Sequence, residues 1–184
     1  MTPAQKTALK ADITAKILPG QPLEALFYPV AGNTDWQGIA GYYNSDSATD
    51  VWRPDVPRAA ICGAVVWKNL TQVDTPDATA LYTNRVLACQ SRQMNLDILL
   101  PPTVDTLPGD QLGFRQGMQD ALQNVPAGAA GALLDGGWLA VRNVLKRLGT
   151  RFEVMFSTVE GVASKSSVYG QRIDGKDCYQ AYVS

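Results

Sequence analysis

The stretch LDGGWLAVRNVLKRLG, residues 134–149, is the most informative about the fold, because it has the most regular apolar spacing in the chain. Its large apolar residues recur at steps of four, three, four and three: Leu134, Trp138, Val141, Leu145 and Leu148. Such steps place side chains on one face of an α-helix. Gly149 is a typical residue just beyond a helix end. The stretch therefore predicts an amphipathic helix whose apolar face packs on another helix.

The partner of that face is expected in a long helix that opens at Thr75-Pro76-Asp77 and ends near Leu100, before Pro101-Pro102. Its apolar residues also form one stripe: Tyr82, Val86, Cys89, Leu96 and Leu100. Two stripes of this kind are expected to pack against each other and form the core.

Further helices are predicted on either side of this pair. Thr2-Pro3-Ala4-Gln5 reads as an N-cap, a proline at the first helical position and a capping glutamine, followed by apolar residues every four positions up to Ile17. Other helices are expected over residues 36–44, 59–67 and 110–125, of which 59–67 also fits a strand. Most of the chain is thus predicted to be helical.

After Gly149 the pattern changes to short apolar alternation, in Phe152, Val154 and Phe156 and again over residues 168–173 and 179–183. Asp174-Gly175 is a dipeptide typical of hairpins. We therefore predict a mainly α fold: a helical bundle body over residues 1–150 and a C-terminal β-strand or hairpin extension over 151–184. The extension is interpreted as a docking arm, since a small isolated ribbon needs a surface to pack on.

Composition limits the chemistry that the chain can perform. The 184 residues contain no histidine, and 16 basic against 17 acidic residues give a net charge of −1. Imidazole acid–base catalysis and imidazole metal ligation are absent, and the near-neutral charge does not favour coating nucleic acid. The three cysteines are far apart and form no metal or redox motif. No catalytic, cofactor-binding or metal-ligating residue is predicted, and no apolar run is long enough to cross a membrane.

Candidate interface residues come from a basic cluster and from aromatic residues. Arg142 and Lys146 are expected one helical turn apart, opposite the apolar stripe of residues 134–149, where they either contact an acidic partner or are simply solvated. Aromatic side chains are frequent interface anchors. The candidates are Arg142, Lys146, Arg147, Arg151, Trp52, Tyr179 and Tyr182.

Six segments, taken in order and spacing, resemble a family of tailed-bacteriophage virion proteins encoded among the head and neck genes. They are LKADI (9–13), IAGYYN (39–44), VWR (51–53), ALYTNRVLACQ (80–90), FRQGMQDALQNVPA (114–127) and GWLAVRNVLKRLGTRFE (137–153). They form a pattern of structural residues and contain no catalytic signature.

The resemblance implies a non-enzymatic head-to-tail connector, also called a neck or adaptor protein, that forms a ring between portal and tail. It further implies about twelve identical copies, contacts with portal and tail proteins, DNA only as passing cargo, and a place in the virion after synthesis in the host cytoplasm. No cofactor and no membrane contact are expected. The alternatives are a capsid-decorating or tail-tube-end (terminator) protein and, more remotely, a small hydrolase that uses paired carboxylates.

Overall fold

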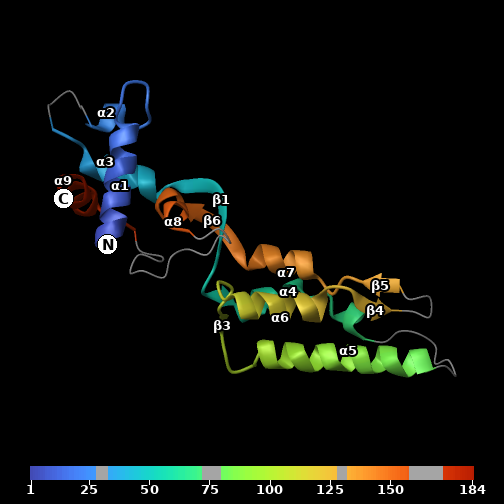
Figure 1. Cartoon of the computed structure of the whole chain (residues 1–184). Helices are drawn as coiled ribbons and strands as arrows, with labels where there is room; N and C mark the ends of the chain where they lie inside the picture. The colour runs from blue at the N-terminus through green and yellow to red at the C-terminus, as the bar shows by residue number, and fades with distance from the viewer. Residues whose placement is uncertain (28–32, 72–79, 128–131, 158–171) are drawn as a thin grey trace. The chain divides into compact units, whose positions relative to one another are not determined.

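The structure is a computed structural model that describes residues 1–27, 33–71, 80–127, 132–157 and 172–184 (Figure 1). These residues are mainly helical and include small two-stranded sheets, which confirms the predicted fold class. They form two compact units. The terminal unit comprises Met1–Val51 and Leu148–Ser184, and the central unit comprises Trp52–Arg147. The predicted division at residue 150 does not coincide with these units, because the two ends of the chain pack together.

The terminal unit is built from helices that belong to both ends of the chain. They are α1 (Pro3–Lys16), α2 (Glu24–Phe27), α3 (Trp36–Asn44), α8 (Arg151–Met155) and α9 (Gly175–Val183). Helix α9 packs against α1 and α3, and their apolar residues share a core that includes Ile13, Ile39 and Cys178. Strand β1 (Asp46–Trp52) pairs with β6 (Lys146–Thr150), and the chain passes between the units in these two strands.

Local capping explains where the N-terminal helices begin. The Thr2 hydroxyl accepts a hydrogen bond from the Gln5 N–H at 3.3 Å, and the Gln5 side chain accepts one from the Thr2 N–H, which is the predicted capping box. Asp35 caps α3 by accepting from the Gly38 N–H at 2.8 Å. The predicted helices at both positions are confirmed.

The predicted C-terminal β extension is wrong, because Phe152 and Val154 of its first supposed strand lie in a helix and so do residues 179–183 of its last. Thr150 and Glu153 form a capping box that starts α8 at Arg151, where a strand through Phe152 was expected. Asp174 and Asp177 form another that starts α9, so Asp174-Gly175 is a helix start and not a hairpin turn. A Cβ on Gly175 would lie 3.0 Å from backbone atoms of α3, so the glycine allows α9 to approach closely. Residues 158–171 of the expected extension lie outside the described residues.

The central unit contains the longest helix among the described residues and two short strand pairs. Its elements are β2 (Val56–Pro57), α4 (Arg58–Ala64), the 3₁₀ helix η1 (Trp67–Leu70), α5 (Ala80–Leu99), β3 (Thr106–Leu107), α6 (Leu112–Leu122), β4 (Val125–Ala127), β5 (Ala132–Leu134) and α7 (Trp138–Val144). Strands β2 and β3 pair antiparallel, as do β4 and β5. The helical interpretation of residues 59–67 is confirmed for most of its length by α4.

The helix predicted over residues 134–149 is shorter than expected. Gly137 has a φ of 100°, and the Asp135 carboxylate accepts from the N–H groups of Gly137 and Trp138, both at 2.9 Å. This turn starts α7 at Trp138 and leaves Leu134 in β5. At the other end, Leu148 and Gly149 belong to β6, so Gly149 is not a helix cap.

The two stripes contribute to one buried core, but the predicted packing of one helix directly on the other is wrong: α7 packs against α4 and α6, and α5 packs against α6. Val141 and Leu145 share one buried core with Cys89, Leu96 and Leu100. Leu134 and Trp138 pack against this core while half-buried. Leu148 is half-exposed and is not part of the core, and the Tyr82 side chain lies outside the described residues.

Candidate interaction surfaces

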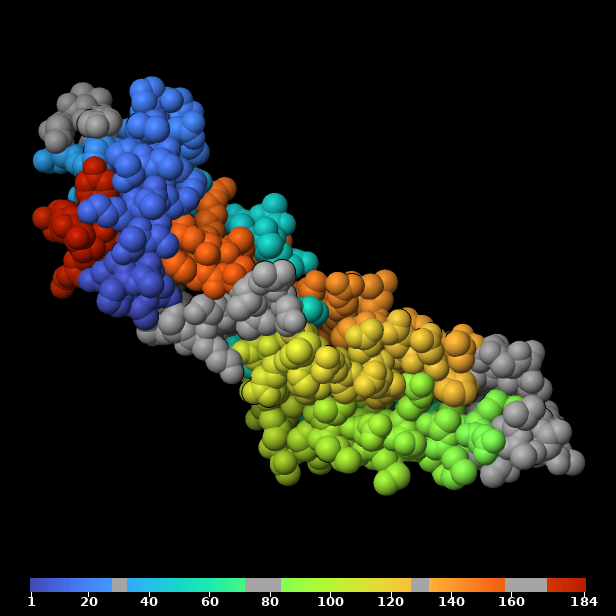
Figure 2. All heavy atoms as spheres, viewed as in Figure 1, coloured from blue at the N-terminus to red at the C-terminus, as the bar shows by residue number. Residues whose placement is uncertain are grey.

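Helix α5 has a second apolar stripe on the face opposite the core. Leu87 is 57% exposed, Met94 66% and Ile98 75%, and their steps of seven and four place them on one face, with Ser91 in the gap. Figures 1 and 2 show α5 beside α6 at the surface of the central unit. We call Leu87, Ser91, Met94 and Ile98 the outer stripe.

The outer stripe is unusual because α5 is already amphipathic toward its own core. Cys89, Leu96 and Leu100, on or just after α5, are buried. A helix that is apolar on two opposite faces normally has both covered. Contiguous exposed apolar residues of this kind commonly mark an interaction site.

A groove in the central unit is formed by α6, β5 and α7. It has a volume of about 540 Å³ and is lined by residues that include Gln119, Gln123, Leu133, Trp138, Leu139 and Arg142. Leu133 and Leu139 are both 61% exposed. The predicted interface residue Arg142 is exposed and lines this groove, which we call the α7 groove.

Two other predicted interface residues lie together inside the central unit. The guanidinium carbon of Arg115 is 4.4 Å from the centre of the Trp52 ring, and the Lys146 Nζ is 4.6 Å from it. Buried Arg115 also donates to the carbonyl oxygens of Gly109 and Asp110, at 3.1 and 2.6 Å. Trp52 and Lys146 thus take part in cation–π contacts that hold this unit together.

The expected exposed face shared by Arg142 and Lys146 is therefore wrong. Helix α7 ends at Val144, so Lys146 lies in β6 and half-buried, whereas Arg142 is exposed. Arg147 is also half-buried in β6.

Arg151 lies in the terminal unit, beside a hollow of about 350 Å³ that polar Asp12, Lys16 and Arg151 line together with apolar Val154 and Met155. Its guanidinium carbon is 4.4 Å from the Tyr42 ring centre, and Nη1 donates to the Ser45 hydroxyl at 3.3 Å. These contacts hold the Arg151 side chain against its own unit.

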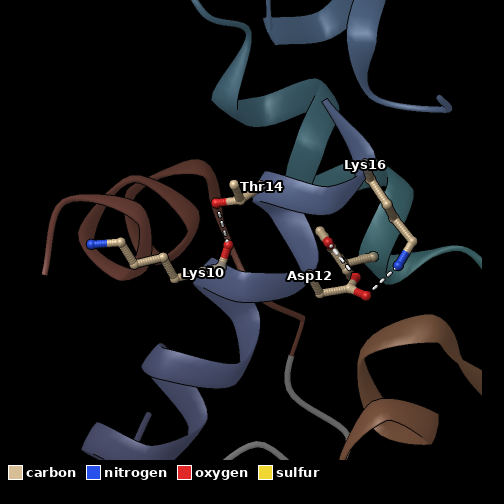
Figure 3. Close-up of polar contacts among 5 residues, drawn as sticks. Lys10, Asp12, Thr14 and Lys16 are labelled. Atoms are coloured by element: carbon tan, nitrogen blue, oxygen red, sulfur yellow. Dashed lines mark hydrogen bonds and ion pairs between the residues drawn. The ribbon is translucent and has the colours of Figure 1, made fainter. Parts of the chain in front are cut away.

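Hydrogen-bonded side chains of α1 and α3 line one side of that hollow. The Asp12 carboxylate pairs with Lys16 one turn along and accepts from the Tyr43 hydroxyl at 2.6 Å. Figure 3 shows Asp12 and Lys16 turned toward each other. On the same helix, the Thr14 hydroxyl donates to the Lys10 carbonyl at 2.8 Å. Burial and the neighbouring Asp12 raise the pKa of Tyr43 far above its ordinary value, so this phenol stays neutral.

Tyr179 and Tyr182 lie on α9 in an aromatic cluster and not on a docking strand. The Trp36 ring centre is 5.6 Å from that of Tyr179 and 5.5 Å from that of Tyr182, and Phe27 is 5.3 Å from Tyr182. Tilted and edge-on rings at such distances attract one another. Both tyrosines therefore cover apolar surface of the terminal unit.

Within the ranges that the structure describes, no group of three or more histidine, cysteine or acidic side chains is placed to hold a metal ion. Burial, followed by the nearby charges of Asp177 and Asp174, raises the pKa of the Cys178 thiol to about 12. That thiol is therefore neutral and poorly nucleophilic near neutral pH. No helix in the described part of the chain is long and apolar enough to cross a membrane.

The structure thus brings together Trp52 with Lys146, and Tyr179 with Tyr182, and leaves Arg142 on a separate groove. The outer stripe was not predicted from the sequence, although one helical face is evident in the spacing of Leu87, Ser91, Met94 and Ile98. The inner stripe of the same helix obscured it. No family model matches this chain, and no curated protein or solved structure matches it either.

Proposed function

We propose that this chain is a structural virion protein of a tailed bacteriophage, a head-to-tail connector that forms a ring of identical copies between portal and tail. The observation that carries the proposal is the exposed outer stripe on α5, a helix whose opposite face already packs in the core. A second apolar face on a packed helix favours a protein that works in an assembly.

A ring places a specific demand on its subunit, namely two different surfaces that fit each other. Contacts that repeat by rotation are head-to-tail, so each copy uses one surface toward the copy before it and another toward the copy after it. The central unit offers two distinct surfaces with exposed apolar side chains, the apolar outer stripe and the mixed polar and apolar α7 groove. This supports a ring subunit.

The charged side chains of the central unit also favour a structural role. Arg58 donates to the Leu100 carbonyl at 3.0 Å, near the end of α5. Arg92 donates to four carbonyl oxygens at and beyond the end of α6, those of Asp120, Ala121, Gln123 and Asn124. These guanidinium groups stabilise helix ends.

The segments that resemble the connector family lie in both units. Residues 39–44 form most of α3 in the terminal unit. In the central unit, residues 80–90 form the first half of α5, and residues 114–127 form most of α6 and strand β4. The net charge of −1 is compatible with DNA that passes through the assembly without being coated.

The proposal is tested by the mass of the purified chain and by its place in the particle. Native mass spectrometry and negative-stain microscopy should show a closed ring, formed either alone or upon addition of the portal. Phage particles that lack the gene should contain filled heads and separate tails.

Two results would overturn the proposal in different directions. Labelled protein spread over the head surface, with heads and tails still joined in its absence, would favour a capsid-decorating protein. A chain that stays monomeric with portal and tail present, and that degrades cell walls, would favour the hydrolase.

A further inference from the structure

We infer that the outer stripe of α5 in one copy docks into the α7 groove of the neighbouring copy. This inference rests on the proposed function, because a ring needs a repeating contact between copies. Both surfaces belong to the central unit, so that unit carries the contact.

The two surfaces match in their apolar side chains, and the groove adds polar ones from Gln119, Gln123 and Asn124. The stripe presents three large exposed apolar side chains, Leu87, Met94 and Ile98. The groove presents exposed Leu133 and Leu139 beside half-buried Trp138. From residue 87 to residue 98 the helix rises about 16 Å, at 1.5 Å per residue, so the stripe covers three turns. Docking would remove both sets of apolar side chains from water.

Charge is complementary at the edges of these surfaces. Asp97 is exposed and lies next to Ile98 along one side of the stripe. Arg142 is exposed and lines the groove, and the Asp135 carboxylate that also lines it accepts from the N–H groups of Gly137 and Trp138 at the start of α7. A carboxylate at the edge of the stripe and a guanidinium in the groove would meet when the two dock, which fixes register and orientation.

A symmetric contact of stripe on stripe fits the structure less well. Such a contact is two-fold, so it closes at a dimer and leaves Leu133 and Leu139 of both copies exposed. Docking of stripe into groove covers both surfaces in every copy of a closed ring. It also repeats by rotation, as a ring requires.

The experiment blocks each surface separately by placing a charge on an exposed apolar residue. Ile98→Glu blocks the stripe and Leu139→Glu blocks the groove, while Leu18→Glu, at an exposed leucine of the terminal unit, is the matched control. Each blocked variant should weaken association by at least about tenfold and run as a monomer by mass photometry. The control should assemble like the wild type. Unchanged circular dichroism and melting temperature show that the variants fold.

Mixing the two blocked variants gives the decisive result. The Ile98→Glu chain keeps an intact groove and the Leu139→Glu chain keeps an intact stripe, so together they should form a one-to-one dimer and nothing larger. No dimer on mixing, or normal assembly of the Leu139→Glu chain, would overturn the docking.

A charge exchange tests the edge contact independently. Asp97→Arg and Arg142→Glu should each weaken association by about two- to fivefold, and the chain that carries both should recover it. If each single variant weakens association and the combined variant does not restore it, the pairing of these two surfaces is contradicted.

The outcomes separate this inference from the proposed function. Rings that survive both Ile98→Glu and Leu139→Glu would reject the docking and leave the connector proposal standing. One-to-one dimers on mixing, together with heads that join tails without the protein, would reject the connector and leave the docking standing.

Discussion

Helices α9 and α5 differ in how completely their own unit covers them. In the terminal unit, α9 packs on both α1 and α3, and its tyrosines turn onto Trp36. In the central unit, α5 packs through one face and leaves Met94 and Ile98 exposed on the other. Helix α9 also leaves Tyr179 50% and Val183 57% exposed, but two helices cover it, whereas the exposed apolar side chains of α5 all lie on one uncovered face. Self-association is expected through the central unit.

The cationic side chains also differ in how far their own unit covers them, even within the central unit. Lys146 and Arg151 each lie over an aromatic ring of their own unit, Trp52 and Tyr42 respectively. Arg142 is exposed at the α7 groove. Of the basic residues that the sequence suggested for an interface, Arg142 is the best placed to contact another copy.

The largest expected effect follows from removing α9. A chain ending at Ile173 loses Cys178 and Ala181 from the core and uncovers Ile13 and Ile39. We expect a loss of several kcal/mol, because each large buried side chain stabilises a fold by about 1.5–3 kcal/mol. Hydrogen exchange should show α1 amides losing protection while α6 amides keep theirs. Retained protection in α1 would instead support a dispensable docking arm.

The two faces of α5 predict a large difference between neighbouring substitutions. Leu96→Ala, at a fully buried side chain, should lower the free energy of unfolding by about 2–5 kcal/mol. Ile98→Ala, at an exposed side chain, should change it by no more than about 0.5 kcal/mol and should weaken association. Urea unfolding of both variants at a concentration where the chain is monomeric measures the difference. Equal losses would show that the outer face is covered within the chain.

Alkaline pH should destabilise the terminal unit. Burial and two nearby carboxylates raise the pKa of Cys178 from 9.0 to about 12, so above pH 9 the unfolded thiol ionises while the folded one stays neutral. The neutral Cys178 thiol therefore costs the fold nothing below pH 9, and the free energy of unfolding declines as the pH rises from 9 toward 12. The pKa of Tyr43 is also raised, so this residue lowers the free energy of unfolding at alkaline pH in the same way. Melting temperatures from pH 8 to 11 should fall less steeply for Cys178→Ala than for the wild type.

The smallest expected effect is a difference in monomer stability between substitutions of Lys146 and Arg142. Lys146→Glu removes a cation from the Trp52 ring and should cost about 0.5–1 kcal/mol of stability. Arg142→Glu should leave the monomer's melting temperature unchanged, because the side chain is exposed. Differential scanning calorimetry of the two variants measures this. A fall in melting temperature for Arg142→Glu would place that residue among the internal contacts.

Helices that are set by local signals were predictable from the sequence. The capping box of Thr2 and Gln5 and the four-residue repeat of Leu9, Ile13 and Ile17 identify α1, and all three apolar residues are buried. Such signals act within a few residues, so neither the units nor their partners are needed to read them.

The predicted helix and strand bounds were wrong where a regular apolar spacing continued from one secondary-structure element into the next. Leu134 and Leu148 keep the helical spacing of residues 134–149, yet the turn at Asp135 and Gly137 and the pairing of β6 place both in strands. In the C-terminal segment, short alternation suggested a strand, but Asp174 and Asp177 form a capping box. Short apolar segments fit either structure, and the cap decides between them.

The candidate site was only partly predictable, because exposure depends on the rest of the fold. Arg142 was correctly singled out as an exposed residue, whereas the ring beneath Lys146 comes from Trp52, far away in sequence. The outer stripe of α5 becomes evident only when the inner stripe is known to be covered.

Cross-linking between copies tests the central claim most directly. In a Cys62→Ser background, where the other two native thiols are buried, Ile98→Cys and Leu139→Cys are introduced into one chain and treated with a short bis-maleimide. Docking of stripe into groove predicts a ladder of covalent multimers up to the size of the ring on a denaturing gel, and no multimers from either single variant. Dimers from Ile98→Cys alone would show a symmetric contact through the stripe, and the absence of any ladder from a ring-forming chain would contradict the account.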